Sequence, residues 1–486
     1  MSDVHIKYIN DVHCKIVCDP GILREISDQF HFFAENYRYH PKFKAKTWDG
    51  KIRMINMLTG VAYCGLIKKI KKFCDARGYS FTFDSQFAYD VISEEKIDKF
   101  IESLNLPVEV RDYQRKSFEV CVSSKRRTLL SPTSSGKSLM IYMILRWFNV
   151  KSLIIVPTNG LVTQMADDFK SYGYEGEIHL STDKINRGDI DADITISTWQ
   201  SLNNGKSSVP KEWYNQFQLV VGDEAHGAKS KSMIQIMECM THIPYRFGTT
   251  GTLGDNELNK HTVEGLFGPT YKSISTKEMI DKNYASKLTI KCIVLKYPKG
   301  TVKPNDKKDK WTYQKEVDFL INNEARNKFI AKLTGSLKGN KLVFFRIQDH
   351  GRELQRLFDQ AGKKYFYIDG DISANEREAI RKQMEEEGDS ILLGSLGTTS
   401  TGINIKKLHH MIAGHPSKSK TKVLQSIGRI LRLHKDKEED GAVFYDIVDD
   451  LNFPQQKNYT LTHFYHRCKI YDSEKFNYQI YEVEIK

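Results

Sequence analysis

The chain has 486 residues with 73 Lys and Arg against 61 Asp and Glu, which gives a formal net charge of +12 at pH 7. Its 40% hydrophobic and 11% aromatic content fits a folded protein of about three domains and excludes intrinsic disorder and a collagen-like chain. No uncharged apolar stretch approaches the ~18 residues of a membrane helix, and the start lacks the layout of a secretory signal, so we expect a cytoplasmic protein.

The N-terminal segment is strongly basic. Between Asn36 and Lys72 there are ten basic residues and one acid, with aromatic residues interleaved. Because cations suit phosphates and aromatic rings suit unstacked bases, we predict a small basic α+β accessory domain at 1–88 that binds nucleic acid. Its candidate contact residues are Lys42, Lys44, Trp48 and Lys51. The alternative is that the aromatic residues form the core of this domain and the lysines a solvated face; both can hold.

From about Pro107 onward, short apolar or β-branched runs alternate with amphipathic stretches of helical length. The predicted strands are 128–131, 152–157, 193–197 and 217–222, with helices such as 137–148 and 161–172 between them. This alternation predicts a mostly parallel sheet covered by helices. The lysine-rich segment 296–314 contains two prolines, so we place a linker or exposed loop at 296–325, after one α/β domain at 89–295.

The sequence SPTSSGKS at 131–138 follows a predicted strand and opens a predicted helix, as a phosphate-binding loop does. Backbone N–H groups from Thr133, Ser134, Ser135 and Gly136 onward would cradle phosphates with the help of the helix N-terminus. Lys137 would neutralise the β- and γ-phosphates, and the Ser138 hydroxyl would ligate Mg²⁺. The alternative is a surface helix that happens to begin with Gly-Lys-Ser.

A pair of acids follows a second apolar strand. Residues 217–222 would deliver Asp223 and Glu224 to the carboxyl end of a parallel sheet, where such sheets bind ligands. Asp223 can hold Mg²⁺ through water, and Glu224 can orient an attacking water. Two exposed loop acids are the alternative, but together with the upstream phosphate loop this pair predicts nucleotide hydrolysis.

The alternation restarts in a second predicted α/β domain at 326–486. Its predicted strands are 341–346, 365–369, 390–395, 410–414 and 442–448. Ser373 and Glu376 predict a capping box at the start of a helix that runs to Glu387.

The sequence QSIGRILR at 425–432 places Arg429 and Arg432 three residues apart, on one face of a predicted helix. Two guanidinium groups directed together suit a triphosphate reached from a neighbouring domain, as arginine fingers do. Taken alone, a basic helix face that binds solvent or acids is the better interpretation.

Together these segments resemble the core of superfamily 2 helicases of the DExH type. The matching segments in chain order are 111–114 (glutamine motif), 131–138 (motif I), 156–158 (Ia), 196–200 (Ib), 223–226 (II), 249–252 (III), 344–346 (IV), 397–404 (V) and 425–432 (VI). The resemblance implies an α/β fold of two tandem RecA-like parallel-sheet domains behind the accessory domain, with ATP and Mg²⁺ in the cleft between them.

The same resemblance assigns roles to further residues. It implies that Gln114 reads adenine and that Asn404 contacts the nucleotide. It implies strand-backbone contacts from Thr158, Thr198, Arg346, Thr398 and Thr401. Our candidates for coupling the nucleotide cleft to the strand are His226, Thr250, Thr252 and Gln425, with ordinary interdomain packing as the alternative.

Over its whole length, including the basic N-terminal segment, the chain resembles the recombination helicases of T-even bacteriophages. That resemblance implies ATP-driven remodelling of branched DNA in recombination, repair and replication: branch migration of forks and Holliday junctions, R-loop unwinding and strand annealing. Single-stranded and branched DNA and an RNA–DNA hybrid are then the expected partners, in the host cytoplasm if a phage encodes the chain. Two alternatives stay open, an RNA-remodelling DExH ATPase and an ATP-gated annealing protein that does not translocate.

Overall fold

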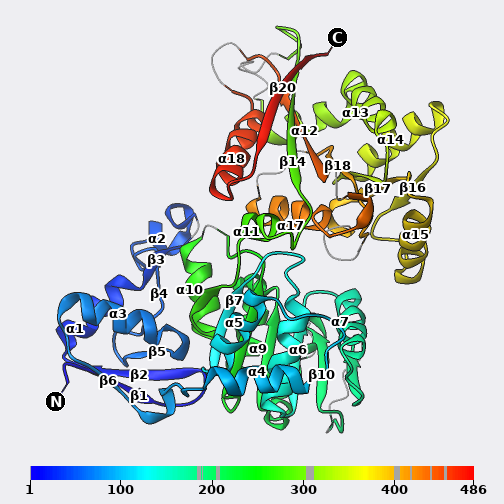
Figure 1. Cartoon of the computed structure of the whole chain (residues 1–486). Coiled ribbons are helices and arrows are strands. Elements are labelled where there is room, and N and C mark those ends of the chain that lie inside the picture. The colour runs from blue at the N-terminus through cyan, green and yellow to red at the C-terminus, as the bar shows by residue number, and fades with distance from the viewer. Residues whose placement is uncertain are drawn as a thin grey trace. The chain divides into compact units, whose positions relative to one another are not determined.

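The computed structural model of the protein describes residues 2–34, 36–182, 188, 190–203, 208–254, 256–302, 311–398, 405–415, 419–437, 441–453 and 457–485. By its internal contacts the chain forms two compact units. The first comprises Met1–Ser131 and Gly136–Ser273, and the second comprises Pro132–Ser135 and Ile274–Lys486. Figure 1 follows the elements of both units along the chain.

The N-terminal part of the first unit mixes strands with short helices. Its elements are β1 (Val4–Tyr8), β2 (His13–Cys18), α1 (Pro20–Gln29), β3 (His31–Phe33), η1 (Tyr37–Tyr39), α2 (Pro41–Lys44), β4 (Lys51–Arg53), β5 (Val61–Tyr63), η2 (Cys64–Leu66), α3 (Ile67–Arg77), β6 (Phe81–Phe83) and η3 (Ser85–Phe87). Its sheet has the order β5-β2-β1-β6, and β1 is antiparallel to β2 and parallel to β6. Alternate residues such as Val4 and Ile6 are buried, so one face of β1 builds the core.

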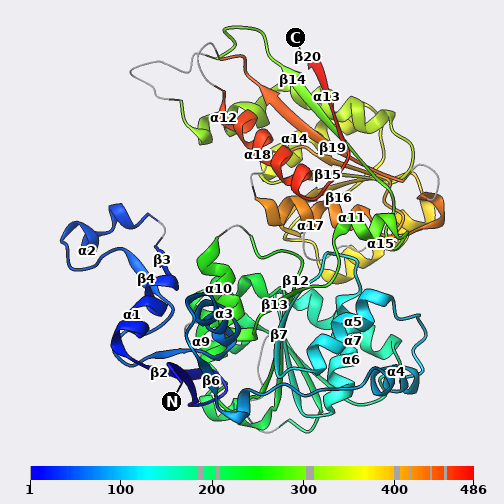
Figure 2. The ribbon, with the colours of Figure 1, turned by 60° about the vertical axis from the view of Figure 1, so that its left-hand side comes forward.

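The basic segment forms an arm beside this sheet. Strands β3 and β4 pair antiparallel, and η1 and α2 lie between them in the chain. We call residues 31–34 and 36–53 the basic arm; it extends away from the four-stranded sheet (Figure 2).

The N-terminal region packs directly on the α/β part of the first unit. A Cβ at Gly65 would lie 1.8 Å from the carbonyl oxygen of Glu264, so only glycine allows this approach of the two backbones. The Tyr63 hydroxyl donates to Glu238 at 2.6 Å, and Lys69 forms an ion pair with Glu264 at 2.5 Å. These contacts make the accessory region and the first α/β domain one packed body.

Within the described residues, seven parallel strands form the main sheet of the first unit, in the order β13-β7-β12-β11-β8-β10-β9. The strands are β7 (Arg126–Leu130), β8 (Ser152–Val156), β9 (Ile178–Ser181), β10 (Ile194–Thr198), β11 (Leu219–Asp223), β12 (Tyr245–Thr250) and β13 (Thr270–Lys272). The helices are α4 (Glu94–Ser103), α5 (Asp112–Val122), α6 (Lys137–Phe148), α7 (Asn159–Ser171), α8 (Trp199–Leu202), α9 (Lys231–Cys239) and α10 (Glu257–Phe267), with the short helical turns η4 (Lys211–Gln216) and η5 (Ala225–Lys229).

The two faces of this sheet are covered by different helices. Ile154 and Val156 of β8 pack into the cluster that includes α5, α6 and α7, whereas Leu153 and Ile155 pack into the cluster that includes α9 and α10. Because successive side chains of a strand point to opposite faces, an uninterrupted apolar strand fills both layers.

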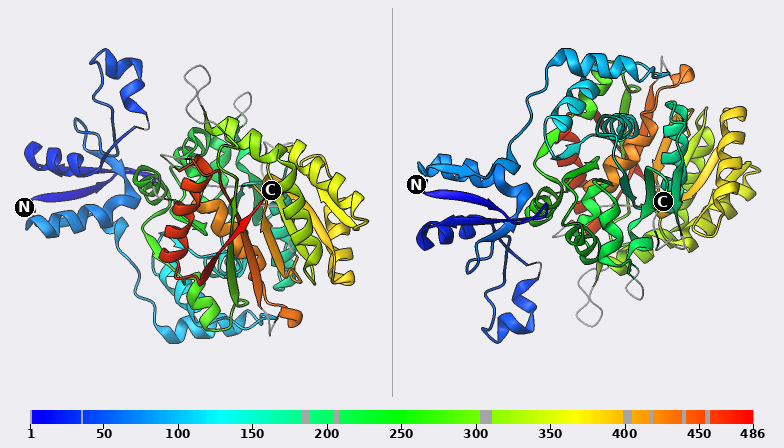
Figure 3. Two further views of the ribbon diagram at one scale, coloured as in Figure 1. Left: turned by 90° about the horizontal axis from the view of Figure 1, so that it is seen from above. Right: turned by 90° about the horizontal axis from the view of Figure 1, so that it is seen from below.

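A second sheet of seven parallel strands lies in the described part of the second unit, in the order β16-β17-β15-β18-β19-β14-β20. The strands are β14 (Leu288–Lys296), β15 (Lys341–Phe345), β16 (Tyr365–Ile368), β17 (Ile391–Ser395), β18 (His410–Ala413), β19 (Ala442–Asp450) and β20 (Tyr478–Glu484). The helices are α11 (Thr276–Asp281), α12 (Tyr313–Asn322), α13 (Glu324–Ser336), α14 (Gln348–Gln360), α15 (Ala374–Glu387), α17 (Lys420–Ile430) and α18 (Tyr459–Ser473), with η6 (Lys435–Lys437). Figure 3 shows α18 on one face of this sheet and α13 and α14 on the other.

These two sheets confirm the expected fold class of tandem RecA-like domains behind a small α/β region. The predicted strands correspond to β7, β8, β10 and β11 in the first unit and to β15–β19 in the second. The capping box at Ser373 is confirmed, since Ser373 and Glu376 exchange both hydrogen bonds.

The division between the units lies earlier than the sequence suggested. We expected the first helicase domain to run to residue 295, yet the second unit takes up the chain at Ile274, and β14 pairs with β19 and β20. An apolar strand signal does not reveal which sheet the strand joins, and this strand precedes the lysine-rich segment that the sequence predicts as the linker.

Among the residues described, none of the helices combines the length and apolar character that a bilayer crossing requires.

Candidate functional site

The phosphate-loop residues stand between β7 and α6. Strand β7 ends at Leu130, and α6 begins at Lys137, with Gly136 as its N-cap in the left-handed conformation at φ +76°. A Cβ at residue 136 would meet Gln114 Nε2 at 2.4 Å and would displace that side chain, and the left-handed backbone angle favours glycine. The first turn of α6 therefore directs its backbone N–H groups out of a tight strand-to-helix turn.

Gln114 lies beside this loop. It is buried on α5, and its Oε1 accepts the backbone N–H of Arg111 at 2.9 Å. In the loop, Ser135 is buried and Ser134 has a left-handed φ of +69°, while Thr133 is partly exposed. Gln114 thus lies next to Gly136 of the loop, and its contact with adenine stays a prediction.

Asp223 ends β11 next to β12. The parallel register pairs Asp223 with Thr249, and the Thr249 hydroxyl donates to Asp223 Oδ1 at 2.6 Å. Burial raises the pKa of Asp223, and Glu224 adds to the rise, while Lys137 and the Thr249 hydroxyl oppose it. Thr249 thus fixes the orientation of this carboxylate, a role that the sequence analysis did not assign.

Glu224 occupies a sharp turn directly after β11, with φ at +50°. Lys137 Nζ donates to Glu224 Oε1 at 3.0 Å, and His226 Nδ1 lies 3.2 Å from Oε2. Burial by itself would raise the pKa of Glu224, but the Lys137 ammonium and His226 outweigh it and lower that pKa well below its ordinary value. Glu224 is therefore a carboxylate held ionised, able to accept a hydrogen bond from a water.

The proposed coupling residues of the first unit contact one another. His226 Nδ1 lies 3.0 Å from the Thr250 hydroxyl, which donates to the carbonyl of Thr252 at 2.8 Å. Thr250 also accepts the backbone N–H of Ser131 through its carbonyl at 2.8 Å. A continuous path of contacts thus runs from Lys137 and the acids to the loop that follows β12.

The oxygen atoms near the loop suit a hard divalent cation. Ser138 Oγ lies 3.0 Å from the Tyr172 hydroxyl, a partner that the sequence analysis missed because Tyr172 ends a different helix. The Ser138 hydroxyl and the Asp223 carboxylate are ligand types that suit Mg²⁺, which binds few protein oxygens and keeps several waters. In the described part of the chain, no group of three or more His, Cys, Asp or Glu side chains forms a separate metal site.

Thr158 and Thr198 follow neighbouring strands of the same sheet. The register pairs Thr198 with Val156, two residues before Thr158. Thr198 Oγ1 accepts the backbone N–H of Ser201 at 3.1 Å, and Gln200 Nε2 donates to the carbonyl of Pro157 at 3.3 Å. The parallel pairing therefore brings motifs Ia and Ib together at the carboxyl edge of the sheet.

The second unit makes a similar pair. Arg346 is exposed directly after β15, and Thr398 follows the neighbouring strand β17, where its N–H donates to Ser395 Oγ at 3.3 Å. Thr401 and Asn404, which the resemblance also assigns to binding, lie outside the described residues.

One expectation for the arginine pair is wrong. Gln425 and Arg429 lie one turn apart on α17, but α17 ends at Ile430 with Leu431 as its C-cap, so Arg432 stands beyond the helix. Ser286 explains the ending, since its N–H donates to the carbonyl of Leu431 at 2.8 Å and its hydroxyl to that of Arg432 at 2.9 Å. Arg429 therefore lies on α17, whereas Arg432 lies in the turn that follows the helix.

Lys437 is a further residue that sequence reasoning missed. Its amino group is buried and donates to the carbonyl of Ile430 at 3.0 Å and to that of Arg432. It therefore caps the end of α17 with a positive charge, next to Arg429 and Arg432.

The basic arm places its lysines outward and its aromatic rings partly inward. Lys42 and Lys44 are exposed on α2. Trp48 is partly buried, with its ring 5.2 Å from that of His40, and its Nε1 donates to the carbonyl of Lys51 at 2.9 Å. The segment thus combines aromatic packing within the arm with a cationic outer face, and its binding of nucleic acid stays a prediction.

Family models match three consecutive parts of the chain. One described as "DNA helicase UvsW, N-terminal" matches 3–84, one described as "Type III restriction enzyme, res subunit" matches 95–255, and one described as "Helicase conserved C-terminal domain" matches 325–434.

Individual proteins resemble the chain over its whole length or most of it. The ATP-dependent DNA helicase uvsW of Enterobacteria phage T4 is 33% identical over 514 residues, which cover 99% of this chain and 100% of that protein. The DNA 3'-5' translocase XPB2 of Sulfurisphaera tokodaii is 24% identical, over 72% of this chain and 85% of its own.

Solved structures agree. The crystal structure of T4 UvsW matches with a TM-score of 0.51 and 33% identity over 99% of both chains. The Type ISP restriction-modification enzyme LlaBIII bound to DNA has a TM-score of 0.59 at 13% identity and covers 78% of this chain and 32% of its own, so it supports the fold alone. With a full-length relative at this identity, the chain belongs to the family of T4 UvsW, the ATP-hydrolysing DNA helicases of superfamily 2.

Proposed function

We propose that the chain is an ATP-driven DNA translocase that remodels branched DNA. The observation that carries the proposal is the path of contacts from Lys137 through Glu224 and His226 to Thr250, at the edge of the sheet where the phosphate loop begins. This path connects the proposed ATP-binding residues, Lys137 and Glu224, to His226 and Thr250, which are the proposed coupling residues.

In this proposal the phosphate loop and the residues around it bind and activate ATP. Lys137 and the N–H groups of the loop bind the phosphates, and Gln114 holds the base. Ser138 and Asp223 hold Mg²⁺, which when bound neutralises charge on the β- and γ-phosphates. Glu224 orients the attacking water because its low pKa keeps it ionised.

The second unit completes the reaction when the units close on the nucleotide. Arg429 and Arg432 then supply positive charge to the transferring phosphoryl group, and Asn404 adds a nucleotide contact. Opening after hydrolysis withdraws that charge.

Each unit also holds the same DNA strand by its backbone. Thr158 and Thr198 do so in the first unit, and Arg346, Thr398 and Thr401 in the second. Backbone contacts carry no sequence information, so closure and opening move the strand regardless of its sequence. His226, Thr250, Thr252 and Gln425 transmit the nucleotide state to these contacts.

The N-terminal region and the full-length likeness to a phage DNA helicase are what support branched substrates in this proposal. The exposed lysines of the basic arm offer a second binding surface beyond the helicase core. We propose branch migration of forks and Holliday junctions, R-loop unwinding and annealing of complementary strands as the resulting activities.

Steady-state ATPase rates on a panel of nucleic acids test this proposal. Single-stranded DNA, duplex DNA, a four-way junction, an RNA–DNA hybrid and RNA are compared at one salt concentration, and the junction is expected to stimulate most. Stimulation by RNA alone would instead identify an RNA-remodelling ATPase. Failure to displace the third strand of a triplex, with ATPase intact, would identify an annealing protein that does not translocate.

The substitution Lys137→Ala tests the assigned nucleotide chemistry. It removes the charge that neutralises the phosphates, so ATP turnover is expected to vanish while DNA binding in a gel-shift assay stays within about twofold. Lys170→Ala, which alters an exposed lysine on α7, is the control and should behave as wild type. ATP turnover that survives in Lys137→Ala would show that this loop does not bind the phosphates.

A further inference from the structure

A cavity of about 200 Å³ lies in the first unit where the N-terminal region meets the main sheet. Its walls come from α3, from β6 and the chain that follows it, and from two short pieces of the α/β domain. Those pieces are Lys125 and Arg126, at the start of β7, and Pro269 before β13.

The cavity is separate from the nucleotide site. It touches the amino end of β7, whereas the phosphate loop follows the carboxyl end of the same strand. At ~3.3 Å per residue, the five residues of β7 put roughly 15 Å of sheet between them. A volume of about 200 Å³ is also smaller than the ~300–1,000 Å³ of pockets that enclose a whole small-molecule ligand.

Aromatic and cationic side chains dominate the lining. The aromatic ones are Phe81, Phe83, Phe87 and Tyr89. The cationic ones are Lys68, Lys71, Lys125 and Arg126, and no Asp or Glu belongs to the lining. Phe83 is 40% exposed and Tyr89 is 53% exposed. The Arg127 guanidinium lies over the Tyr89 ring, 5.9 Å from its centre, and the Phe81 ring centre lies 6.3 Å from that of Phe83, so both rings keep partners while remaining partly accessible at the rim.

Most of the cationic side chains that line the cavity form only weak or solvent-exposed interactions within the protein. Lys71 pairs with Asp75 one turn along α3, with both side chains half exposed, and such a surface pair contributes little. Lys125 donates to the carbonyl of Gln86 at 3.2 Å, and Lys68 is exposed on α3. Among these four cations, only Arg126 has a largely buried acidic partner, Asp11 at 3.9 Å, between the N-terminal region and the α/β domain.

We infer that this cavity accepts an unstacked base of a single DNA strand, with Lys68, Lys71 and Lys125 on the flanking phosphates. Every base has an aromatic face, and a cationic rim without acids is complementary to the phosphates on either side of it. Stacking of this kind is independent of sequence, as a translocase needs. The inference rests on the proposed DNA function and adds to it a strand-holding site outside the helicase motifs.

The test measures the affinity of the full-length chain for a thymidine oligonucleotide and for an abasic oligonucleotide of equal length. In the variant Phe83→Leu/Tyr89→Leu, apolar volume is kept but the ring faces are lost. Affinity for the thymidine strand is expected to fall about fivefold or more, and affinity for the abasic strand to stay unchanged. Val91→Ala, a fully exposed neighbour in the same stretch, is the control.

The lysines are tested by salt dependence. Lys68→Gln/Lys71→Gln should weaken binding of both oligonucleotides equally and reduce the slope of log affinity against log salt by about 1.4, two phosphates at ~0.7 each for a single strand. Lys72→Gln, which alters an exposed residue of α3 outside the cavity, should leave the slope nearly unchanged.

Several results would overturn the inference. One is equal loss of affinity for thymidine and abasic strands in Phe83→Leu/Tyr89→Leu; another is an unchanged affinity for both. Weaker binding of that variant to phosphatidylglycerol vesicles, with oligonucleotide binding intact, would assign the cavity to lipid. Circular dichroism melting checks folding, and Tyr89→Leu alone replaces the double variant if it melts early.

The proposed function and this inference fail in different ways. If the wild-type chain neither binds the oligonucleotides nor hydrolyses ATP in their presence, both are wrong. If the wild type does both and the cavity variants match it, only the cavity inference is wrong.

Discussion

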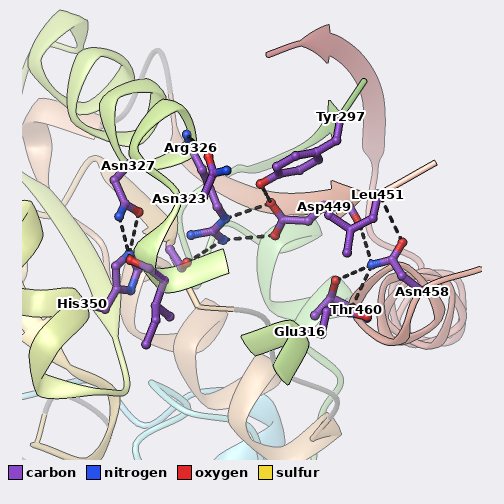
Figure 4. Close-up of polar contacts among 12 residues, drawn as sticks. Tyr297, Glu316, Asn323, Arg326, Asn327, His350, Asp449, Leu451, Asn458 and Thr460 are labelled. Carbon is purple, nitrogen blue, oxygen red and sulfur yellow. Dashed lines mark hydrogen bonds and ion pairs between the residues drawn. The ribbon is translucent and has the colours of Figure 1, made fainter. Parts of the chain in front are cut away.

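Arg326 and Asp449 form an ion pair in the second unit with both side chains fully buried. Arg326 Nε donates to Asp449 Oδ1 at 2.8 Å, and the Tyr297 hydroxyl donates to the same oxygen at 3.0 Å (Figure 4). The three residues come from α13, β19 and the end of β14, so the pair ties together the edge of the sheet from which Arg346 also emerges. Burial raises the pKa of Tyr297, which keeps its hydroxyl protonated as a donor.

The substitution Asp449→Asn is expected to lower the free energy of unfolding by about 3–5 kcal/mol, because it leaves the Arg326 charge buried without its counter-charge. Urea unfolding followed by circular dichroism measures the change. Glu324→Gln, which breaks the exposed pair with Lys328 on the same helix α13, should change stability by less than about 1 kcal/mol. Equal effects of the two substitutions would contradict this account of the buried pair.

Lys437 gives the protein a distinct dependence on pH. Burial, with a contribution from Arg432, lowers the pKa of Lys437 from 10.5 to about 8. The unfolded chain therefore binds more protons than the folded chain between these two values. Stability rises with pH across this interval, since the cost of a buried charge disappears as the lysine loses its proton in the folded state.

We predict that this contribution amounts to about 3 kcal/mol between pH 8 and 10.5. It appears as an increase in the difference in unfolding free energy between the wild type and Lys437→Met, measured by urea titration at several pH values. For Lys435→Met, at an exposed position of the same short helix, the difference should stay flat. A flat difference for Lys437→Met as well would mean that its amino group is not desolvated.

At the scale of elements, α17 carries two residues of the proposed mechanism on a helix that is capped at both ends. Its N-cap Ser419 accepts the N–H of Lys422 through its side chain, and the Lys437 amino group donates to the carbonyl of Ile430, the last residue of the helix. A helix held at both ends keeps Gln425 and Arg429 in a fixed relation one turn apart.

For Arg429→Ala we predict near-normal ATP binding, measured with a fluorescent analogue, and hydrolysis reduced by ~10³ or more, the scale of an arginine finger. Lys435→Ala, at an exposed position after the helix, is the control. If binding and hydrolysis fell together, Arg429 would be a structural residue of α17 and not a group that acts on the transition state.

At the scale of the whole molecule, the N-terminal region cannot be removed without damage to the first unit. Deletion of residues 1–88 would uncover the surface of α10 against which Gly65 packs, together with Glu238, the partner of Tyr63. A lower DNA affinity of such a deletion variant could therefore come from lost DNA contacts or from lower stability of the first unit. Substitutions on the exposed basic arm separate these two causes.

The triple variant Lys42→Gln/Lys44→Gln/Lys51→Gln should weaken duplex DNA binding at all sequences and reduce the salt slope by up to about 2.7, three phosphates at ~0.9 each. Fluorescence anisotropy over a range of salt concentrations measures the slope. The matched control replaces three ion-paired surface lysines of the same unit: Lys99, Lys116 and Lys260. An unchanged slope in the arm variant would assign this surface to protein contacts.

Local signals in the sequence determined most of the two α/β domains. The apolar strands, the SPTSSGKS turn and the acids after β11 are contiguous patterns, and each acts through neighbours within a few residues. For that reason α6 begins and ends as predicted, at Lys137 and Phe148, and Ser373 caps its helix. The parallel sheet then brings the motifs to one edge without further information.

Only the tertiary structure decided which distant segments meet. Thr249 and Asp223 are 26 residues apart, Ser138 and Tyr172 are 34 apart, and their contacts depend on strand register and helix packing. The end of α17 is set by Ser286 and Lys437, which override a helical pattern that continues through Arg432. The sequence likewise could not predict that β14 pairs with β19 and β20. An apolar strand can join either sheet, and only the packing of the whole domain selects one of them.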